Sequence, residues 1–172
     1  MSLLTRNRLA GFALALATFA VDRGVKAWIA GPLALPEQGA IYITSFFSLR
    51  WTQNLGVSLG LLSASSSEGR LALLAMTGLI ALGVAIWMLR EKAMGELAGL
   101  AVILGGALGN IYDRFTRGYV IDYADLHFGE VRPFQIFNLA DAAITLGVLI
   151  LLARSLFSRE KREPGSPSPT EI

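Results

Sequence analysis

The chain has 172 residues, of which 53% are hydrophobic and only 16% charged, and its formal net charge is +2. A soluble domain has about 25% charged residues, so this composition predicts an integral membrane protein. The absence of Cys excludes disulfides and a cysteine nucleophile, and the single His argues against a histidine-rich metal centre or a Ser-His-Asp triad. The basic residues lie near the ends of apolar segments, so no nucleic-acid-binding surface is expected.

The first apolar segment covers residues 9–30 and follows Arg6 and Arg8. A cleaved signal peptide is an alternative interpretation, because a basic start, a short apolar core and small residues near Ala15 and Ala17 fit that pattern too. Three more apolar segments follow, so an uncleaved membrane helix is the simpler prediction.

Residues 31–69 are not a membrane span. Pro32 and Pro36 break helix, and the following IYITSFFSLRWTQ is rich in β-branched and aromatic residues. We predict a small amphipathic sheet that lies on the membrane surface, with Phe46 and Trp51 at the level of the lipid headgroups.

Three further spans are predicted at about residues 71–89, 93–112 and 136–157. About 20 residues are enough to cross a hydrocarbon core of roughly 30 Å. The predicted fold is therefore all-α and membrane-integral: four transmembrane helices in one domain, residues 1–158, with a small membrane-surface β-sheet in the first outer loop. Residues 159–172 are charged and then rich in Pro and Ser, which predicts a disordered cytoplasmic tail.

The distribution of Lys and Arg predicts the orientation. Basic residues gather at both termini and in the loop between the second and third spans, and the positive-inside rule places that side in the cytoplasm. This group has eight of the 15 basic residues: Arg6, Arg8, Arg90, Lys92, Arg154, Arg159, Lys161 and Arg162.

Polar residues from separate pieces of the chain are expected to reach the opposite, outer side. One comes from the first helix, one from the first outer loop, and the others from the end of the third helix, the following connection and the start of the fourth helix. Spacings of three and four residues place the members of each helical group on one face. Gly105 and Gly109 lie one turn apart below this group and predict close approach of another helix. The polar residues are Asp22, Asn54, Asn110, Asp113, Arg114, Asp122, Asp125, Asn138 and Asp141.

Two carboxylates that activate a water are the most economical chemistry for this residue set. Two nearby Asp side chains cannot both ionise at low cost, so one keeps a proton and the pair supplies an acid and a base at the same pH. Asp122 and Asp141 are the candidates, because one comes from the connection and the other from the start of the facing helix. We expect no metal and no cofactor.

The motifs DRGVK, TQNLG, GGALGNIYDR, GYVIDY and FNLAD occur in this order from Asp22 onward. In this they resemble the lipoprotein signal peptidases, also called signal peptidase II. The resemblance implies a monomeric aspartyl peptidase of the bacterial inner membrane that removes the signal peptide of a prolipoprotein before a diacylglyceryl-modified Cys. It implies inhibition by cyclic peptide antibiotics such as globomycin, and it suggests that the surface sheet can close over the substrate as a lid. On this resemblance Asp122 and Asp141 are catalytic, and the supporting or substrate-binding residues are Asp22, Asn54, Asn110, Arg114 and Asn138.

Two motifs depart from the family pattern. The first more usually reads DQxTK, and Gly56 is more usually followed by Ala-Phe-Gly than by Val57, Ser58 and Leu59. These departures concern contacts with lipid or signal peptide and leave the two aspartates in place.

Each polar residue also has a structural interpretation. Asp141 can be a helix cap, Asn110 and Asn138 can join helices, and Asp22 can neutralise Lys26. Asp113 and Arg114 are interpreted as a structural pair or a contact to lipid phosphate, and Arg114 can also bind the polar head of the substrate. Asn54 can be a turn residue, and the remaining loop residues, Asp125, His127 and Glu130, are expected to be solvated.

Two other classes of function remain open. Intramembrane Asp residues also occur in the proton paths of transporters, and a proton-coupled transporter is the main alternative. A small scaffold subunit is the other, although it would need no clustered carboxylates.

Overall fold

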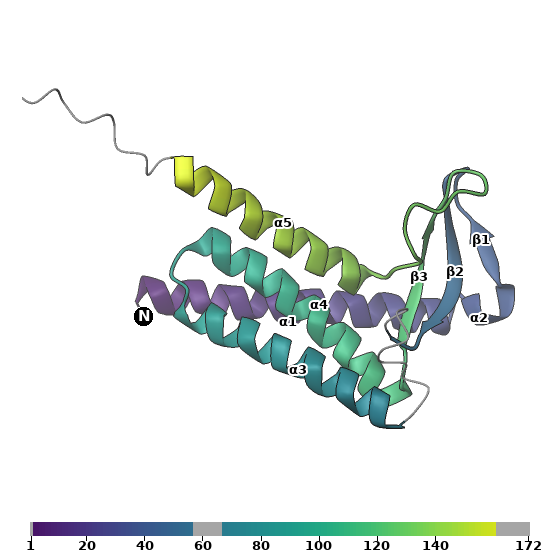
Figure 1. Cartoon of the computed structure of the whole chain (residues 1–172), viewed down its shortest axis with the longest axis horizontal. Coiled ribbons are helices and arrows are strands. Elements are labelled where there is room, and N and C mark those ends of the chain that lie inside the picture. Colours follow the sequence, from purple (N-terminus) through teal and green to yellow (C-terminus); the bar gives the residue numbers. More distant parts are fainter. Residues whose placement is uncertain (1, 57–66, 161–172) are drawn as a thin grey trace, which may run out of the picture.

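The computed structural model describes residues 2–56 and 67–160 of the chain, with side chains up to residue 157. Within these residues, four long helices lie side by side and a small sheet lies across one end of them (Figure 1). The start of α1 and the end of α5 lie at the end away from the sheet (Figure 1). The helices are α1 (Leu3–Ala30), the short α2 (Leu35–Gln38), α3 (Ser67–Arg90), α4 (Met94–Arg117) and α5 (Leu139–Glu160).

Three of the described helices, α3, α4 and α5, are long and apolar enough to cross a membrane. The exterior of the bundle is apolar, as expected for helices in contact with lipid: Leu71 and Leu79 on α3 are 67% and 69% exposed. The prediction of a mainly helical membrane protein is confirmed. α1 is not one of the three, because its 28 residues include five charged side chains, so a fourth span stays a prediction.

The helices extend beyond the predicted spans at most ends. α1 begins at Leu3 rather than residue 9, and α4 ends at Arg117 rather than residue 112, so α4 includes the whole polar group at its outer end. α5 continues to Glu160, into the predicted tail. The other tail residues, 161–172, lie outside the described residues. So do Val57, Ser58 and Leu59, which depart from the family pattern.

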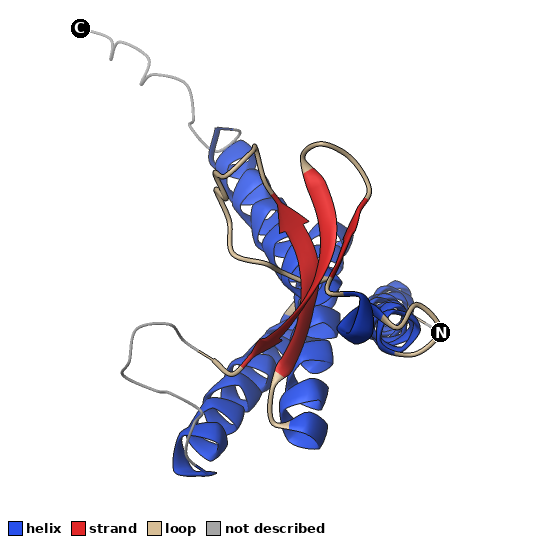
Figure 2. Cartoon of the chain, turned by 90° about the vertical axis from the view of Figure 1, so that its right-hand side faces the viewer, coloured by secondary structure: helices blue, strands red, loops and turns tan. Residues whose placement is uncertain are grey.

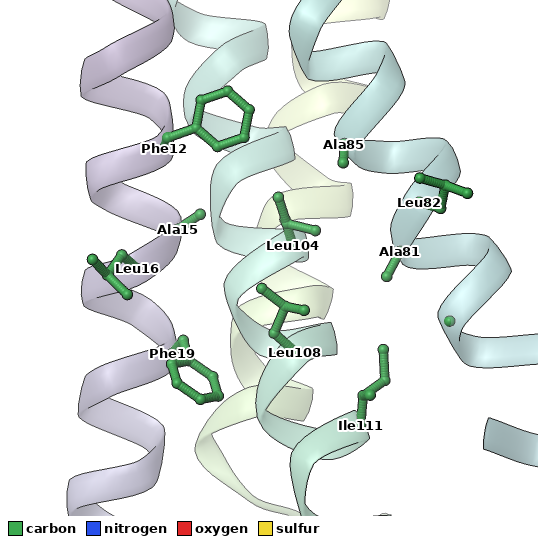
Figure 3. Close-up of a pocket in the computed structure, with 11 residues that line it drawn as sticks. Phe12, Ala15, Leu16, Phe19, Ala81, Leu82, Ala85, Leu104, Leu108 and Ile111 are labelled. Atoms are coloured by element: carbon green, nitrogen blue, oxygen red, sulfur yellow. The ribbon is translucent and has the colours of Figure 1, made fainter. Parts of the chain in front are cut away.

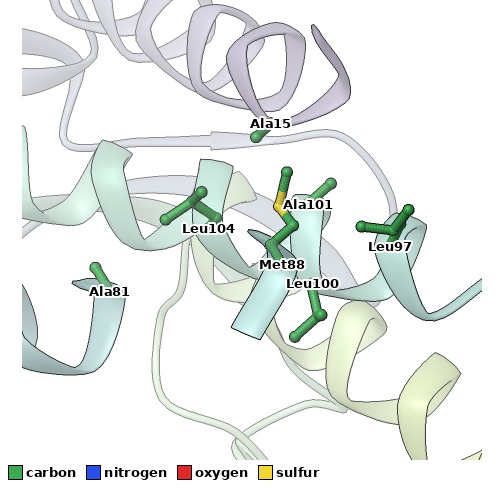
Figure 4. Close-up of a cluster of buried hydrophobic side chains, with 7 residues drawn as sticks. All are labelled: Ala15, Ala81, Met88, Leu97, Leu100, Ala101 and Leu104. Carbon is green, nitrogen blue, oxygen red and sulfur yellow. The ribbon is translucent and has the colours of Figure 1, made fainter. Parts of the chain in front are cut away.

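Glycines on α4 let its neighbours approach closely. A Cβ on Gly105 would lie 2.5 Å from the backbone oxygen of Ala15 on α1, and a Cβ on Gly106 would lie 2.5 Å from that of Ala140 on α5. α4 therefore packs directly against both helices, as the glycine spacing predicted. Buried residues of α1, α3 and α4 form a hydrophobic core next to these contacts (Figure 4): Ala15, Ala81, Met88, Leu97, Leu100, Ala101 and Leu104.

α3 packs mainly against α4 and leaves a groove beside α1. Phe12, Leu16 and Phe19 of α1 line one side of the groove, and Ala81 and Leu82 of α3 line the other (Figure 3). Its volume is about 490 Å³, and all of its lining residues are apolar. A groove of this kind contributes packing surface and has no group for acid–base chemistry.

The sheet joins two loops that are far apart in sequence. Its antiparallel strands are β1 (Ala40–Tyr42), β2 (Phe47–Asn54) and β3 (Val120–Leu126), in that spatial order. Figure 2 shows them crossing the ends of the helices. The predicted sheet in residues 31–69 is confirmed for β1 and β2, but the prediction missed β3, which comes from the connection between α4 and α5.

Candidate active site

Asp122 lies on β3 and faces the ends of the helices. The expectation that it lies in a loop is wrong, because β3 pairs with β2 and Asp122 is opposite Thr52. It is 1% exposed. The Nδ2 of Asn54, at the end of β2, donates to its Oδ2 at 2.9 Å, and the Nδ2 of Asn138 donates to its Oδ1 at 2.5 Å. Each carboxylate oxygen therefore has one amide partner.

Asp141 lies in the first turn of α5 and is fixed by a reciprocal cap. Its backbone N–H donates to the Oδ1 of Asn138 at 3.0 Å, and its Oδ2 accepts from the backbone N–H of Asn138 at 3.1 Å. This is the geometry of a capping box, which satisfies N–H groups that a helix start leaves free. The Nδ2 of Asn110, on α4, donates to the Oδ1 of Asp141 at 2.8 Å. Asp141 thus serves as a structural cap and also faces the polar group.

Asn138 contacts both aspartates. Its side-chain amide donates to Asp122 and its backbone amide donates to Asp141, while the same side chain also donates to the Oδ1 of Asn110 at 3.2 Å. Hydrogen bonds therefore connect five of the seven candidate residues in one group: Asn54, Asp122, Asn138, Asn110 and Asp141.

Asp22 supports this group from α1. Its Oδ1 accepts from the backbone N–H of Ala140 at 3.1 Å, so it holds the first turn of α5. Lys26, which is completely buried, lies 3.0 Å from Asp22, 2.9 Å from Asp113 and 3.1 Å from the Oδ1 of Asn110. The predicted pair of Asp22 and Lys26 is confirmed, and the structure adds that Lys26 also contacts Asn110. Sequence reasoning assigned Lys26 no place in the site, although the DRGVK motif contains it.

Asp113 belongs to the same ion network. Besides Lys26 it pairs with Arg23 at 2.5 Å and with Arg117 at 2.9 Å. Its expected pairing with Arg114 is not among the ion pairs of the described residues. These ion pairs reduce the cost of placing the charged groups among apolar helices.

Arg114 is the candidate residue for which the described part of the chain shows no side-chain hydrogen bond or ion pair. Its Nε is buried and has no hydrogen bond there, and its charge acts on Asp141 and Asp122. A buried N–H without an acceptor is costly and is explained when a ligand supplies the acceptor. Its role in binding a polar head stays a prediction.

Burial raises the pKa of Asp122 to about 6. The hydrogen bond from Asn54 acts in the opposite direction, and the negative charge of Asp141 raises the pKa further. A carboxyl in a poorly solvated place loses its proton less easily, because the charged form is the one that burial penalises. Asp122 is therefore able to hold a proton closer to neutral pH than an ordinary Asp.

Each of the two aspartates lines a different cavity. The first, which we name the strand cavity, has a volume of about 590 Å³ and is lined by Asn54 and Asp122. The second, the helix cavity, has a volume of about 510 Å³ and is lined by Asp141 and apolar residues of α5. Phe134 and Gln135 line both cavities, so they stand between them.

The end of β3 and the connection that follows it differ from the expectation of a solvated loop. Asp125 is completely buried and His127 is 7% exposed, so the expectation is wrong for both residues, although it is right for Glu130. Asp125 is buried because it is paired with Arg50 and Arg132. No group of three or more His, Asp or Glu side chains that could hold a metal ion is found in the described ranges.

The helices are long and apolar enough to cross a membrane, two aspartates are held by one asparagine at their end, and the matching family is one of peptidases, so the class of protein is a membrane-embedded peptidase. The chain belongs to the signal peptidase II family, because the family model described as "Signal peptidase (SPase) II" matches residues 14–157.

Relatives named lipoprotein signal peptidase cover nearly the whole chain. The protein of Sphingopyxis alaskensis is 48% identical over 160 residues, which are 93% of this chain and 92% of the relative. That of Rhizorhabdus wittichii is 51% identical over 158 residues, 92% of each chain. That of Francisella tularensis subsp. novicida is 40% identical and matches 92% of this chain and 98% of the relative.

Two solved structures, both described as bacterial membrane enzymes, have a similar fold. One has a TM-score of 0.76 and 21% identity, and the alignment covers 92% of this chain and 94% of the other. The second has a TM-score of 0.73 and 23% identity, and covers 86% and 92%. At these identities the likeness concerns the fold alone.

Proposed function

We propose that this chain removes the signal peptide from diacylglyceryl-modified prolipoproteins by cleaving before the lipidated Cys, with Asp122 and Asp141 as its catalytic pair. The observation that carries the assignment of residues is the double contact of Asn138, whose side-chain amide and backbone amide hold one aspartate each. The family and the names of the relatives support the substrate class.

The reaction uses one protonated and one ionised carboxyl. Asp141 takes a proton from a water, the resulting hydroxide attacks the scissile carbonyl carbon, and the carbon–nitrogen bond breaks as Asp122 gives its proton to the leaving nitrogen. The products are a carboxylic acid and an amine, which become a carboxylate and an ammonium by passing one proton between them, and the two aspartates have exchanged their protonation states.

The environment of each aspartate supports this order. Burial favours the protonated form of Asp122. Asp141 lies at the positive end of the α5 dipole and accepts from two N–H groups, which stabilise negative charge. The proton shared by the pair therefore starts on Asp122.

The two cavities suit an amphiphilic substrate. The helix cavity extends along α5 past Leu146 and Leu149, where acyl chains or an apolar signal helix fit. The strand cavity contains Gln53, Asn54 and Arg132 and suits the polar chain that follows the cleavage site. The scissile bond would lie where the cavities meet.

The membrane setting follows the positive-inside rule. We infer a bacterial inner-membrane protein with α1 as a fourth span, both termini in the cytoplasm and the sheet at the outer surface, where it can act as a lid. Residues 1–158 form the peptidase domain, which acts as a monomer, needs no metal or cofactor, and is inhibited by cyclic peptides such as globomycin.

A proton-coupled transporter is not favoured. Membership of a peptidase family argues against it. A relay would also need polar groups through the membrane, whereas the buried polar residues of the described helices gather near the sheet: Asp22, Lys26, Asn110 and Asp113.

Cleavage of a diacylglyceryl-modified prolipoprotein by the purified protein in lipid tests the proposal. Asp122→Asn and Asp141→Asn should each reduce kcat by roughly a thousandfold or more, because each removes a proton-transfer group. Both variants should keep their helix content, and a chelator should not change the rate. Near-normal processing by either variant would exclude the pair.

A further inference from the structure

The connection from β3 to α5 contains a short segment that lines the cavities beside both aspartates. Phe128 and Val131 pair across a tight turn at Gly129, whose φ is +60°, and the chain then returns alongside β3. Such two-residue turns need the positive φ that glycine adopts at little cost. We name residues 133–136 the strap, because they run from this turn to the start of α5.

Both ends of the strap are fixed to β3. At one end Phe137 pairs with Ala124 through backbone hydrogen bonds of 2.7 and 3.1 Å. At the other end the Nε of Arg132 lies 3.2 and 3.3 Å from the two oxygens of Asp125. The attachment at Phe137 is made by backbone atoms, whereas the attachment at Arg132 is made by side chains.

The strap forms the boundary between the two cavities. Its Phe134 and Gln135 line the strand cavity with Asp122 and the helix cavity with Asp141. The position of these two side chains therefore sets the width of the passage in which the scissile bond would lie.

Asp125 can affect the boundary between the cavities through Arg132, although it lines neither cavity itself. It is completely buried on β3, three residues after Asp122, and has two basic partners. Arg132 connects it to the strap, whereas Arg50 connects it to β2, on the other side of β3 from Phe137. Arg132 holds Asp125 through charge-assisted hydrogen bonds from its Nε, which are strong and directional, whereas Arg50 is paired with Asp125 by charge alone, because its Nε makes no hydrogen bond in the described residues.

We propose that Asp125 is a positioning residue for substrate binding, which acts through Arg132 to hold the strap and thereby the passage between the two cavities. This inference rests on the proposed peptidase function and extends it to a residue that touches no catalytic group. Loss of the contact should widen the passage and weaken substrate binding, while the aspartates and their amides stay in place.

Arg132 and Arg50 give a matched pair of variants. Both side chains are partly exposed, 42% and 38%, so neither substitution should unfold the protein. Arg132→Gln should raise KM roughly tenfold with kcat changed by less than about threefold, a loss of one charge-assisted contact. Arg50→Gln removes the same charge from the same carboxylate but not from the strap, so its KM should stay within about twofold of wild type.

A double-mutant cycle separates the contact from a direct effect of Arg132 on the substrate. Asp125→Asn keeps the shape of the side chain, and combined with Arg132→Gln it should raise KM no further than the larger single effect. Equal effects of Arg132→Gln and Arg50→Gln, or multiplication of the effects of Asp125→Asn and Arg132→Gln, would overturn the proposal. A wild-type protein that fails to cleave the prolipoprotein would instead refute the proposed function.

Discussion

The aspartates of the candidate site are held almost entirely by neutral amides. Asn54, Asn110 and Asn138 donate to them, and none of these donors carries a charge. The nearest buried lysine, Lys26, does not contact the two aspartates directly. It contacts Asn110 and Asp22 instead. This arrangement orients both carboxyls without forcing both to ionise, because a cation in direct contact would strongly favour the charged form.

The pKa of Asp122 gives the site a testable pH dependence. As the acid, Asp122 must be protonated, so kcat/KM should fall as pH rises above about 6, by roughly tenfold per pH unit once deprotonation is complete. The hydrogen bond from Asn54 lowers this pKa, so Asn54→Ala should move the fall to higher pH. Measurement of kcat/KM from pH 5 to 9 checks this.

Gln53→Ala is the control for this prediction. Gln53 precedes Asn54 on β2 and also lines the strand cavity, but it is exposed and no hydrogen bond to Asp122 is found for it among the described residues. Its pH profile should match that of wild type. A shift of the Asn54→Ala profile to lower pH would show that Asp122 is not the acid.

For single residues, the sequence predicted which side chains belong to the polar group better than it predicted which contacts each of them makes. Asp122, Asp141, Asn54, Asn110 and Asn138 are brought together as expected, because depth and helix spacing restrict where each can lie. The burial of Asp125 was not predictable. It depends on Arg50 and Arg132, and the contact with Arg50 crosses 75 positions of the chain.

Among the secondary-structure elements, α4 positions the site because it contacts each of the other long helices. Its glycines allow α1 and α5 to approach, and Gly109 leaves space for the carboxylate of Asp22. The distance from Asn110 to Asp141 is therefore set by the packing of α4 against α5.

Gly106→Ala tests this dependence. The new Cβ would lie 2.5 Å from the backbone oxygen of Ala140, next to Asp141, so α5 must move. Displacement of a catalytic group by about 1 Å can cost on the order of a hundredfold in rate, and we expect a loss of that size in kcat. A cleavage assay with folded variants measures it.

Gly83→Ala is the matched control, since the same change on α3 meets no atom within 4 Å. Its activity should equal that of wild type, because alanine also favours helix. Equal loss in both variants would mean that glycine matters through helix formation and not through the contact of α4 with α5.

The elements themselves were largely predictable from hydropathy. Long apolar segments gave the four helices within a few residues, while the exact ends depended on side chains such as Asn138 that cap them. β3 was missed, since seven residues between two spans give a weak pattern and the partner strand β2 lies about 70 positions earlier. Pairing over such distances is not encoded locally.

At the scale of the whole molecule, the basic residues predict how the protein is oriented in the membrane. The start of α1, which contains Arg6, and the end of α3, which is Arg90, lie at the end of the bundle away from the sheet (Figure 1). In the orientation that we propose from the positive-inside rule, the sheet and the aspartates face the outer side. Water needed for peptide hydrolysis would reach them from that side.

Cysteine labelling can check this orientation, because the chain has no Cys of its own. Ser45, in the turn between β1 and β2, and Lys92, between α3 and α4, are both exposed. In intact inner-membrane vesicles of right-side-out orientation, Ser45→Cys should react with an impermeant reagent and Lys92→Cys should not. The reverse pattern would place the site on the cytoplasmic side.

The capping box of Asn138 and Asp141 also constrains how this part of the sequence can change. One helical turn separates the two residues, and helix geometry rotates successive residues by about 100°. Insertion or deletion of a single residue between them would turn Asp141 away from Asn110 while leaving the apolar surface of α5 long enough for the membrane. The spacing of these two residues should therefore tolerate no change in length.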